Sequence, residues 1–180
     1  MLNEDFLTRK LRGGIAKQIV SDLFTESGCE VYQLGYESNF SALKNKIRNN
    51  YDDTSLRIRT FPDLLILSKD KPLLIEVKYR SYAGRFDIKE KELYDYQRFW
   101  PEAFIIIVIP DDVGFYAQRI CDINPEGRIS ILEGKNVVAL SIKDNFFPIK
   151  KFLEFSHIEL GLIRKFNDAI KKIILFEEKR

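Results

Sequence analysis

The sequence predicts an α/β protein in which a mixed β-sheet is flanked by helices. Amphipathic helical patterns lie near both ends of the chain, and apolar β-branched runs lie between them. The 180 residues are 45% hydrophobic and 31% charged, a composition typical of one compact domain. We expect a single domain over residues 1–180, with a core at about 12–142 and a C-terminal helical extension at about 148–180.

The first third of the chain predicts a helix, a strand and a polar excursion. Ile15, Ile19 and Leu23 recur at helical spacing over residues 14–27, and Gly28 stands where a left-handed C-cap is favoured. Residues 29–36 mix β-branched and aromatic side chains, which favours a strand. Residues 38–60 are polar and basic, and we expect an excursion with a short helix over 40–47.

The middle of the chain predicts a hairpin, a helix and a buried strand. Residues 63–68 and 72–79 are apolar runs on either side of a polar turn, which is the pattern of a β-hairpin. A helical pattern over residues 88–101 stops at Pro101. The continuous β-branched run over residues 103–110 predicts a strand that is covered on both faces.

The last third predicts three short strands and a long helix. The strand candidates are residues 113–120, 127–132 and 136–142, and the helix begins at about residue 156. Its side chains at helical spacing form one apolar stripe. The stripe consists of Ile158, Leu162, Ile163, Phe166, Ile170, Ile173 and Ile174.

The composition indicates where the protein is expected to be located and which partners it is expected to have. No apolar run approaches the roughly 18 residues that cross a bilayer, and the first residues lack a secretory apolar stretch, so we expect a soluble, cytoplasmic protein without a membrane partner. Cys29 and Cys121 have no metal-ligand spacing and are expected to be buried thiols. The net charge of +2 is too small to indicate nucleic acid, so any such surface must be local.

The hairpin carries three charged residues at one end. Because side chains alternate along a strand, Glu76 and Lys78 project from one face. A turn centred at residues 70–71 places Asp63 opposite Lys78, and Leu65 opposite Glu76, so that all three charges share this face. The remaining positions on both faces of the hairpin are apolar.

Charges at the end of an apolar hairpin must be paired or must bind an ion. Two neighbouring carboxylates repel each other, and a divalent cation such as Mg²⁺, with its preference for hard oxygen ligands, relieves that repulsion. A lysine beside such a site can position water and stabilise negative charge on phosphoryl oxygens. The pattern therefore favours phosphodiester hydrolysis, and the alternative is a structural salt bridge of Lys78 with Asp63 or Glu76.

These residues resemble a known family. Pro62-Asp63, followed after twelve intervening residues by Glu76-Val77-Lys78, is similar to the motif of the PD-(D/E)XK nuclease superfamily, which includes restriction endonucleases and archaeal-type Holliday-junction resolvases. The resemblance covers residues 12–110 and implies a restriction-endonuclease-like sheet flanked by helices. It also implies that Asp63, Glu76 and the Val77 backbone carbonyl ligate Mg²⁺, with Mn²⁺ as a substitute, and that Lys78 is the catalytic lysine.

The chain departs from the family on the first helix. Many members place a glutamate there, whereas this sequence has Lys17 and Gln18 at the candidate positions. Gln18 can hydrogen-bond a metal-bound water without adding charge, and Glu37 is a possible replacement from elsewhere in the chain. Some members place a glutamine or tyrosine on the helix after the hairpin, and Gln97 fits this position, with Tyr94 one turn earlier.

Basic residues flank the hairpin in sequence and are candidates for DNA contacts. Arg80 and Arg85 follow the second strand, and Arg80 shares a face with Glu76 and Lys78. The remaining candidates lie in the excursion, for which a solvated loop is the alternative. They are Lys44, Lys46, Arg48, Arg57 and Arg59.

Two functions follow from the resemblance. The first is a Mg²⁺-dependent endodeoxyribonuclease that acts on DNA in junction resolution, restriction, homing or repair, as a homodimer because cutting two strands needs two sites. The second is a nuclease-fold protein that binds nucleic acid or assembles without catalysis, which the missing acid on the first helix favours. His157, far in sequence from the hairpin, is expected to be structural.

Overall fold

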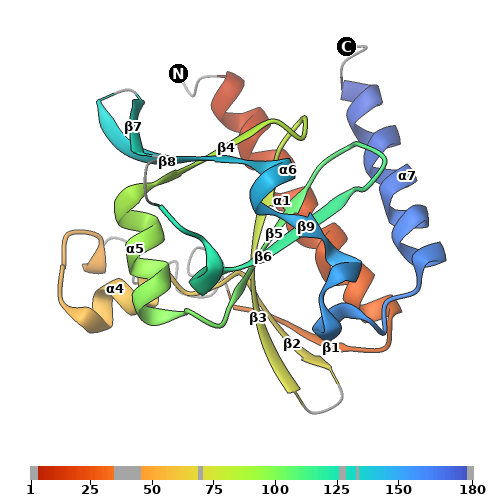
Figure 1. Ribbon diagram of the computed structural model, residues 1–180, viewed down its shortest axis with the longest axis horizontal. Helices are drawn as coiled ribbons and strands as arrows, with labels where there is room; N and C mark the ends of the chain where they lie inside the picture. Colours follow the sequence, from red (N-terminus) through yellow and green to blue (C-terminus); the bar gives the residue numbers. More distant parts are fainter. Residues whose placement is uncertain (1–3, 35–45, 69–70, 126–128, 133, 178–180) are drawn as a thin grey trace.

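The computed structural model describes residues 4–34, 46–68, 71–125, 129–132 and 134–177 (Figure 1). Its helices are α1 (Glu4–Glu26), α4 (Asp53–Arg59), α5 (Glu90–Phe99), α6 (Ile142–Asn145) and α7 (Leu160–Glu177). Its strands are β1 (Glu30–Gln33), β2 (Leu64–Ser68), β3 (Lys71–Tyr79), β4 (Arg85–Lys89), β5 (Phe104–Val108), β6 (Phe115–Arg119), β7 (Ile129–Leu132), β8 (Lys135–Ser141) and β9 (Phe147–Pro148). Short 3-10 turns lie at Ile120–Asp122, Ile149–Lys151 and Leu153–Phe155.

The main sheet has six strands in the order β1-β2-β3-β5-β6-β9. The β3–β5 pair is parallel and the other pairs are antiparallel. A parallel pair needs a long crossover, and β4 and α5 supply it. Every residue of β5 is buried, as its β-branched run predicts. The predicted fold class, α/β with a mixed sheet flanked by helices, is confirmed.

The hairpin register differs from the predicted one. Leu64 pairs with Ile75 and Leu65 with Leu74, so the predicted pairing of Leu65 with Glu76 is wrong. The paired strand ends are Ser68 and Lys71, which places the turn one residue earlier than predicted. A two-residue shift in pairing keeps every side chain on its own face, because the side-chain period is two. Glu76 and Lys78 therefore share a face of β3 as predicted, whereas Asp63 precedes the paired residues of β2.

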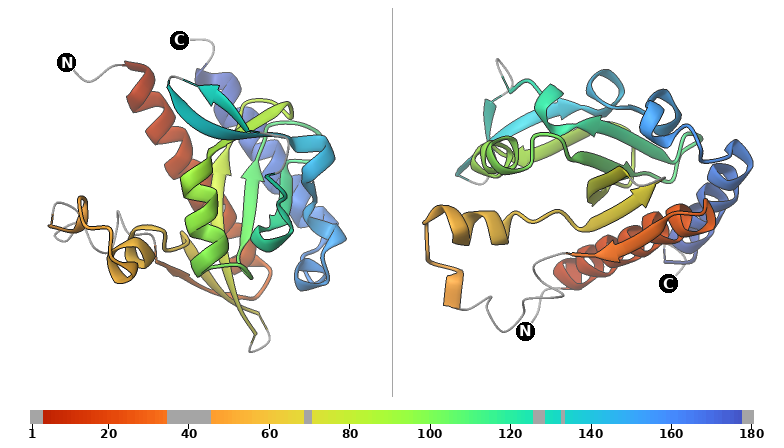
Figure 2. Two further views of the ribbon diagram at one scale, coloured as in Figure 1. Left: turned by 60° about the vertical axis from the view of Figure 1, so that its left-hand side comes forward. Right: turned by 90° about the horizontal axis from the view of Figure 1, so that it is seen from below.

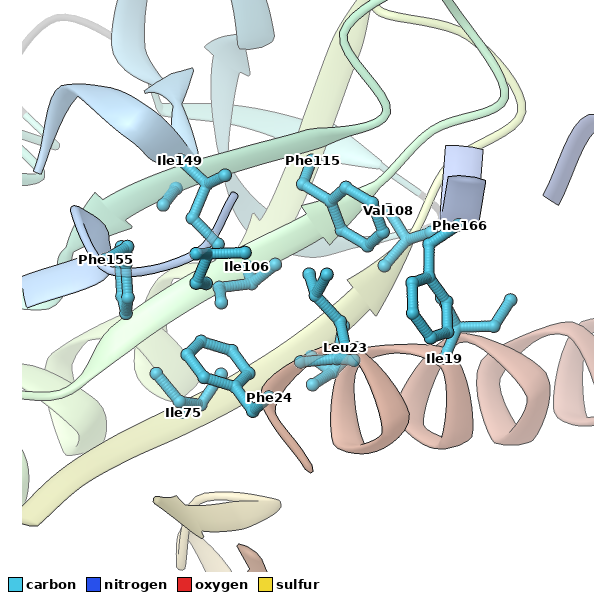
Figure 3. Close-up of a cluster of buried hydrophobic side chains, with 14 of the residues drawn as sticks. Ile19, Leu23, Phe24, Ile75, Ile106, Val108, Phe115, Ile149, Phe155 and Phe166 are labelled. Carbon is cyan, nitrogen blue, oxygen red and sulfur yellow. The ribbon is translucent and has the colours of Figure 1, made fainter. Parts of the chain in front are cut away.

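One face of the main sheet is covered by α1 and α7 (Figures 1 and 2). Leu23 and Phe24 of α1 pack with Ile106 of β5 and Phe166 of α7, all of them buried (Figure 3). The C-terminal helix thus contributes to the same apolar cluster as the sheet, through Ile163, Phe166 and Ile170 of its predicted stripe.

The opposite face is covered by α5 and by a second sheet of three strands in the order β4-β8-β7 (Figure 2). Phe86 of β4 and Leu93 of α5 pack in one buried cluster with Ile105 and Ile107 of β5. Since β3 pairs in register with β5, Glu76 lies beside Ile105 and Lys78 beside Ile107. Those two charged side chains therefore project toward α5.

Several local predictions need correction. The first helix begins at Glu4 rather than residue 14, and the last at Leu160 rather than at about 156. Helix α4 was not predicted, although Asp52 caps it by accepting a hydrogen bond from the Ser55 amide at 3.0 Å. Strand β4 was also missed. Cys29 is buried as expected, but Cys121 is exposed.

Other predictions lie at the limits of the described residues. The helix predicted over residues 40–47 falls mostly outside them, with only its last two residues helical in the described part. Gly28 has φ +84°, as a left-handed C-cap requires. Within the part of the chain that the structure describes, no helix is long and apolar enough to span a membrane.

Burial predicts where the free energy of folding is concentrated. Ile106→Ala, at the centre of the sheet, is expected to lower the free energy of unfolding by about 3 kcal/mol because it removes buried methyl groups and leaves a cavity. Ile131→Ala is the matched control, since that side chain is 77% exposed, and its expected effect is below about 0.5 kcal/mol. Urea denaturation measures both. Equal losses would contradict this placement of the core.

Candidate active site

A cleft of about 770 Å³ opens where the first residues of β2 face the middle of β3, between α1 and α5. Its lining combines two acidic groups of the hairpin with basic and polar side chains of both helices and of the excursion. The lining residues are Gly14, Lys17, Gln18, Gln33, Arg48, Arg59, Phe61, Asp63, Leu64, Glu76, Lys89, Glu92 and Tyr96.

Asp63 immediately precedes β2 and is 7% exposed. Its Oδ2 accepts a hydrogen bond from the Val77 amide of β3 at 3.0 Å, and its Oδ1 lies 2.6 Å from the Lys17 Nζ of α1. Its backbone carbonyl accepts from the Leu34 amide at 2.8 Å, which anchors the residue to the segment after β1. These contacts fix the carboxylate at the point where α1 and two strands meet.

Glu76 lies within β3 and is 6% exposed. Its Oε1 lies 2.8 Å from the Lys78 Nζ, and Tyr96 of α5 lines the same cleft, where its hydroxyl acts to lower the pKa of the carboxylate. Burial raises the pKa of Glu76 above its ordinary value, Lys78 opposes this rise, and the charge of Asp63 adds to it. A buried carboxylate whose pKa is raised favours an additional positive charge nearby.

Lys78 is held between two carboxylates. Its Nζ lies 2.8 Å from Glu76 Oε1 and 3.2 Å from Glu92 Oε1, and 5.9 Å from the centroid of the Tyr96 ring. Burial lowers the pKa of Lys78, but the charges of Glu76 and Glu92 outweigh burial, so that the pKa is raised above its ordinary value. The ammonium group therefore keeps its proton at neutral pH.

Glu92 and Tyr96 were not predicted as site residues. They are four positions apart on α5, so they lie on one face of that helix and reach Lys78 and Glu76 together. Their spacing on a helix directly after the motif was the available signal. Burial and the charges of Glu76 and Glu92 raise the pKa of Tyr96 well above its ordinary value, so its hydroxyl stays a donor.

The donor set of the site fits a magnesium ion. Asp63, just before β2, and Glu76, within β3, present hard carboxylate oxygens to one cleft. Mg²⁺ is commonly bound through one or two carboxylates, while water and phosphate oxygens complete its shell. The described residues contain no group of three or more His, Cys, Asp or Glu side chains arranged for a metal ion. A cation here would thus depend on ligands beyond the two carboxylates.

The other predicted polar residues lie apart from these carboxylates or outside the described part of the chain. Gln18 lines the cleft, but its amide donates to Asp22 Oδ1 at 2.7 Å. Gln97 donates to the backbone carbonyl of Ile123 at 2.7 Å and is absent from the described lining of the cleft. Tyr94 is 61% exposed, and Glu37 lies outside the described residues.

The predicted basic residues divide into two groups. Arg48 and Arg59 line the cleft, and the Arg59 guanidinium donates to the Arg48 carbonyl. Lys46 is exposed, and the Arg57 guanidinium lies 5.4 Å from the centroid of the Phe99 ring. Lys44 lies outside the described residues.

Of the two arginines after the hairpin, Arg80 lies at a neighbouring cleft of about 360 Å³, which shares Lys89 and Glu92 with the first. Arg80 lines it and donates to the carbonyls of Tyr79 and Asp87 at 2.6 and 3.3 Å. Arg85 is exposed and forms an ion pair with Asp87 at 2.5 Å. The first cleft thus carries Arg48 and Arg59, and the second carries Lys78 and Arg80.

His157 lies at another part of the molecule, as predicted. Its Nε2 is 3.2 Å from the Sγ of the buried Cys29, and its ring is tilted against Phe24. It lines a separate depression of about 380 Å³ with Ser68 and Lys71 at the turn end of the hairpin. These contacts indicate packing rather than chemistry.

No protein-family model matches the chain, and no curated protein matches it. Two solved nuclease structures are similar to the chain. One is Hjc, a Holliday junction resolvase of Archaeoglobus fulgidus, with 13% identity, a TM-score of 0.46, and coverage of 77% of this chain and 93% of that chain. The other is D212, a nuclease from a fusselovirus, with 14% identity, a TM-score of 0.48, and coverage of 95% and 99%. At these values the similarity concerns the fold alone.

Lys78 compensates the buried charge of Glu76, so its removal is expected to make the free energy of unfolding depend on pH. In Lys78→Met, Glu76 loses its nearest cation and its folded-state pKa rises further above the unfolded value. Such a group contributes stability at low pH that is lost as pH rises through the folded pKa. We expect the free energy of unfolding to fall by about 1–3 kcal/mol between about pH 5 and about pH 8.

The control for this experiment is the double variant Lys78→Met with Glu76→Gln, which cannot titrate at position 76. Urea denaturation across the same pH range should show no such slope beyond that of the wild type. A Lys78→Met variant as insensitive to pH as this control would contradict the burial of a charged Glu76.

Proposed function

We propose that this protein is a metal-dependent deoxyribonuclease, an endonuclease that hydrolyses phosphodiester bonds in DNA. The observation that supports this most is the placement of two buried carboxylates, Asp63 and Glu76, in one cleft that Arg48 and Arg59 also line. Lys78 contacts Glu76 from the same strand at 2.8 Å. A surface salt bridge accounts poorly for this set, because both carboxylates are less than 10% exposed.

Asp63, Glu76 and the backbone carbonyl of Val77 would hold Mg²⁺, or Mn²⁺ in its place. When bound, the ion polarises a phosphoryl oxygen and makes water a better nucleophile. In the proposed reaction a water oxygen attacks the phosphorus, one P–O ester bond breaks, and the leaving oxygen takes up a proton. Two hard-ligand carboxylates and a phosphate-rich substrate are a donor set that Mg²⁺ accepts.

Lys78 serves this reaction as a fixed positive charge. Because Glu76 and Glu92 hold its ammonium group in the protonated state, Lys78 is suited to donate hydrogen bonds to phosphoryl oxygens and not to remove a proton from water. Glu92 fixes the direction of the ammonium group, and Tyr96 fixes the carboxylate of Glu76. We therefore assign Glu92 and Tyr96 positioning roles.

DNA would lie across both clefts, with its phosphates against basic side chains on either side of Lys78. On one side we propose Arg48, Arg59, Arg57, Lys46 and Lys44, and on the other Arg80 and Arg85. Such contacts supply affinity and register but carry no sequence information. A duplex has two strands to cut, so we also propose a homodimer that presents two sites.

A second candidate function is DNA binding without cleavage. It is favoured by the 2.6 Å contact between Lys17 and Asp63, because an ammonium group satisfies a carboxylate that a metal would otherwise take. The basic lining of the clefts serves this function as well as it serves a nuclease.

Cleavage assays separate the two functions. With Mg²⁺ or Mn²⁺, the purified protein is expected to cut DNA, and Asp63→Ala, Glu76→Ala and Lys78→Ala are each expected to lower the rate by a factor of about 100 or more. The first two changes remove a proposed metal ligand, and the third removes a positive charge that would stabilise the reacting phosphate. Linear duplex, single-stranded, flap and four-way junction DNA should be compared side by side to identify the substrate.

The matched control is Glu26→Ala, which removes an exposed carboxylate of α1 outside the cleft and should leave the rate unchanged. Cleavage that survives all three changes in the site would reject the nuclease. Binding of DNA without cleavage under every metal condition would favour the second function.

Phosphate contacts predict a salt-dependent loss of DNA affinity. Arg59→Gln, in the cleft, is expected to weaken binding by about 1 kcal/mol for every DNA sequence and to reduce the slope of log K against log salt by about 1. Lys165→Gln, on α7, is the control because that exposed lysine pairs with Glu26 away from the cleft. Fluorescence anisotropy at several salt concentrations measures both, and equal effects would place the DNA elsewhere.

A further inference from the structure

Lys17 lies where a third acidic ligand was expected, and it contacts the first. Its Nζ is 2.6 Å from Asp63 Oδ1, although its side chain is 43% exposed and lines the cleft. The second oxygen, Asp63 Oδ2, accepts the Val77 amide hydrogen bond at 3.0 Å. Both oxygens of Asp63 therefore have a donor from within the chain.

The two lysines of the site are held differently. Lys78 contacts two carboxylates, Glu76 and Glu92, so the loss of one contact leaves it anchored. Among the described residues Lys17 has one carboxylate partner, Asp63. Gly14 lies nearly one turn earlier on α1 and also lines the cleft, and a Cβ added there would meet no atom within 4 Å. Open space thus lies beside Lys17, into which its flexible side chain can move.

A divalent cation at Asp63 and the Lys17 ammonium repel each other, because both positive charges would lie within a few ångströms of one carboxylate. Binding of the cation must then either displace the Lys17 ammonium or be weakened by this repulsion. The Lys17–Asp63 contact is partly exposed to solvent, so its disruption is less costly than that of a fully buried pair.

We propose that Lys17 is a resident counter-ion of Asp63 that competes with the divalent cation and sets the metal affinity of the site. The proposal rests on the nuclease function proposed above. In this proposal Lys17 controls the metal affinity through its charge and is not itself a ligand. Removal of the ammonium should raise the affinity, and its replacement by a carboxylate should raise it more.

Calorimetric titration of the full-length protein with Mn²⁺ tests this without any activity measurement. Lys17→Met keeps much of the apolar stem, removes the charge, and is expected to tighten Mn²⁺ binding by about fivefold. Lys17→Glu adds a carboxylate and is expected to tighten it by about tenfold or more. Lys165→Met is the control, since it also removes an ammonium paired with a carboxylate, in this case Glu26 away from the cleft, and it should leave the affinity unchanged.

Asp63→Ala, alone and combined with Lys17→Met, separates this inference from the proposed function. If Mn²⁺ binding depends on Asp63 but Lys17→Met and Lys17→Glu do not tighten it, the competition is rejected and the metal site stands. If no form of the protein binds Mn²⁺ through Asp63, both are rejected. If the Lys17 variants bind Mn²⁺ more tightly than the wild type and Asp63→Ala abolishes this binding, the competition is supported. This holds also if the wild type shows no measurable binding.

Discussion

Two carboxylates are buried at one end of an apolar sheet, and each is stabilised there by an ammonium group. Asp63 is compensated by Lys17 from α1, and Glu76 by Lys78 from its own strand. Without these partners the cost of removing each negative charge from water would favour protonation or local opening. The cleft therefore depends on packing that brings a lysine within reach of each carboxylate.

Packing supplies those positions from both faces of the main sheet. Helix α1 covers one face through Leu23 and Phe24, and α5 covers the other through Leu93. The parallel pairing of β3 with β5 directs Glu76 and Lys78 toward α5, where Tyr96 and Glu92 receive them. The site is thus a product of the layer arrangement as much as of the hairpin that carries its motif.

The sequence predicted the elements that have strong periodicity. The buried run of β5, the hairpin and the amphipathic helices follow from local patterns, and the common face of Glu76 and Lys78 follows from alternation alone. Register did not, because the turn between residues 68 and 71 lacks a residue pair that dictates its type. Helix α4 and strand β4 are short, and tertiary packing rather than a long pattern specifies them.

The site was predictable to the extent that it is local in sequence. The contact of Lys17 with Asp63 joins two elements that are distant in sequence, so no spacing in the chain predicts it. From the sequence, Lys17 showed only that the expected acid was missing from the first helix. The structure shows that its ammonium group contacts Asp63. Glu92 and Tyr96 were accessible in principle from their four-residue spacing, but their direction depends on how α5 sits on the sheet.

The division of the site between a hairpin and a remote helix also bears on how the chain folds. The β2–β3 hairpin closes a short loop and can pair early, whereas the docking of α1 requires contacts between distant parts of the chain. Until α1 docks, Asp63 lacks the nearby positive charge of Lys17. Electrostatic attraction and apolar burial therefore both favour the docking of α1, which completes the cleft and the core together.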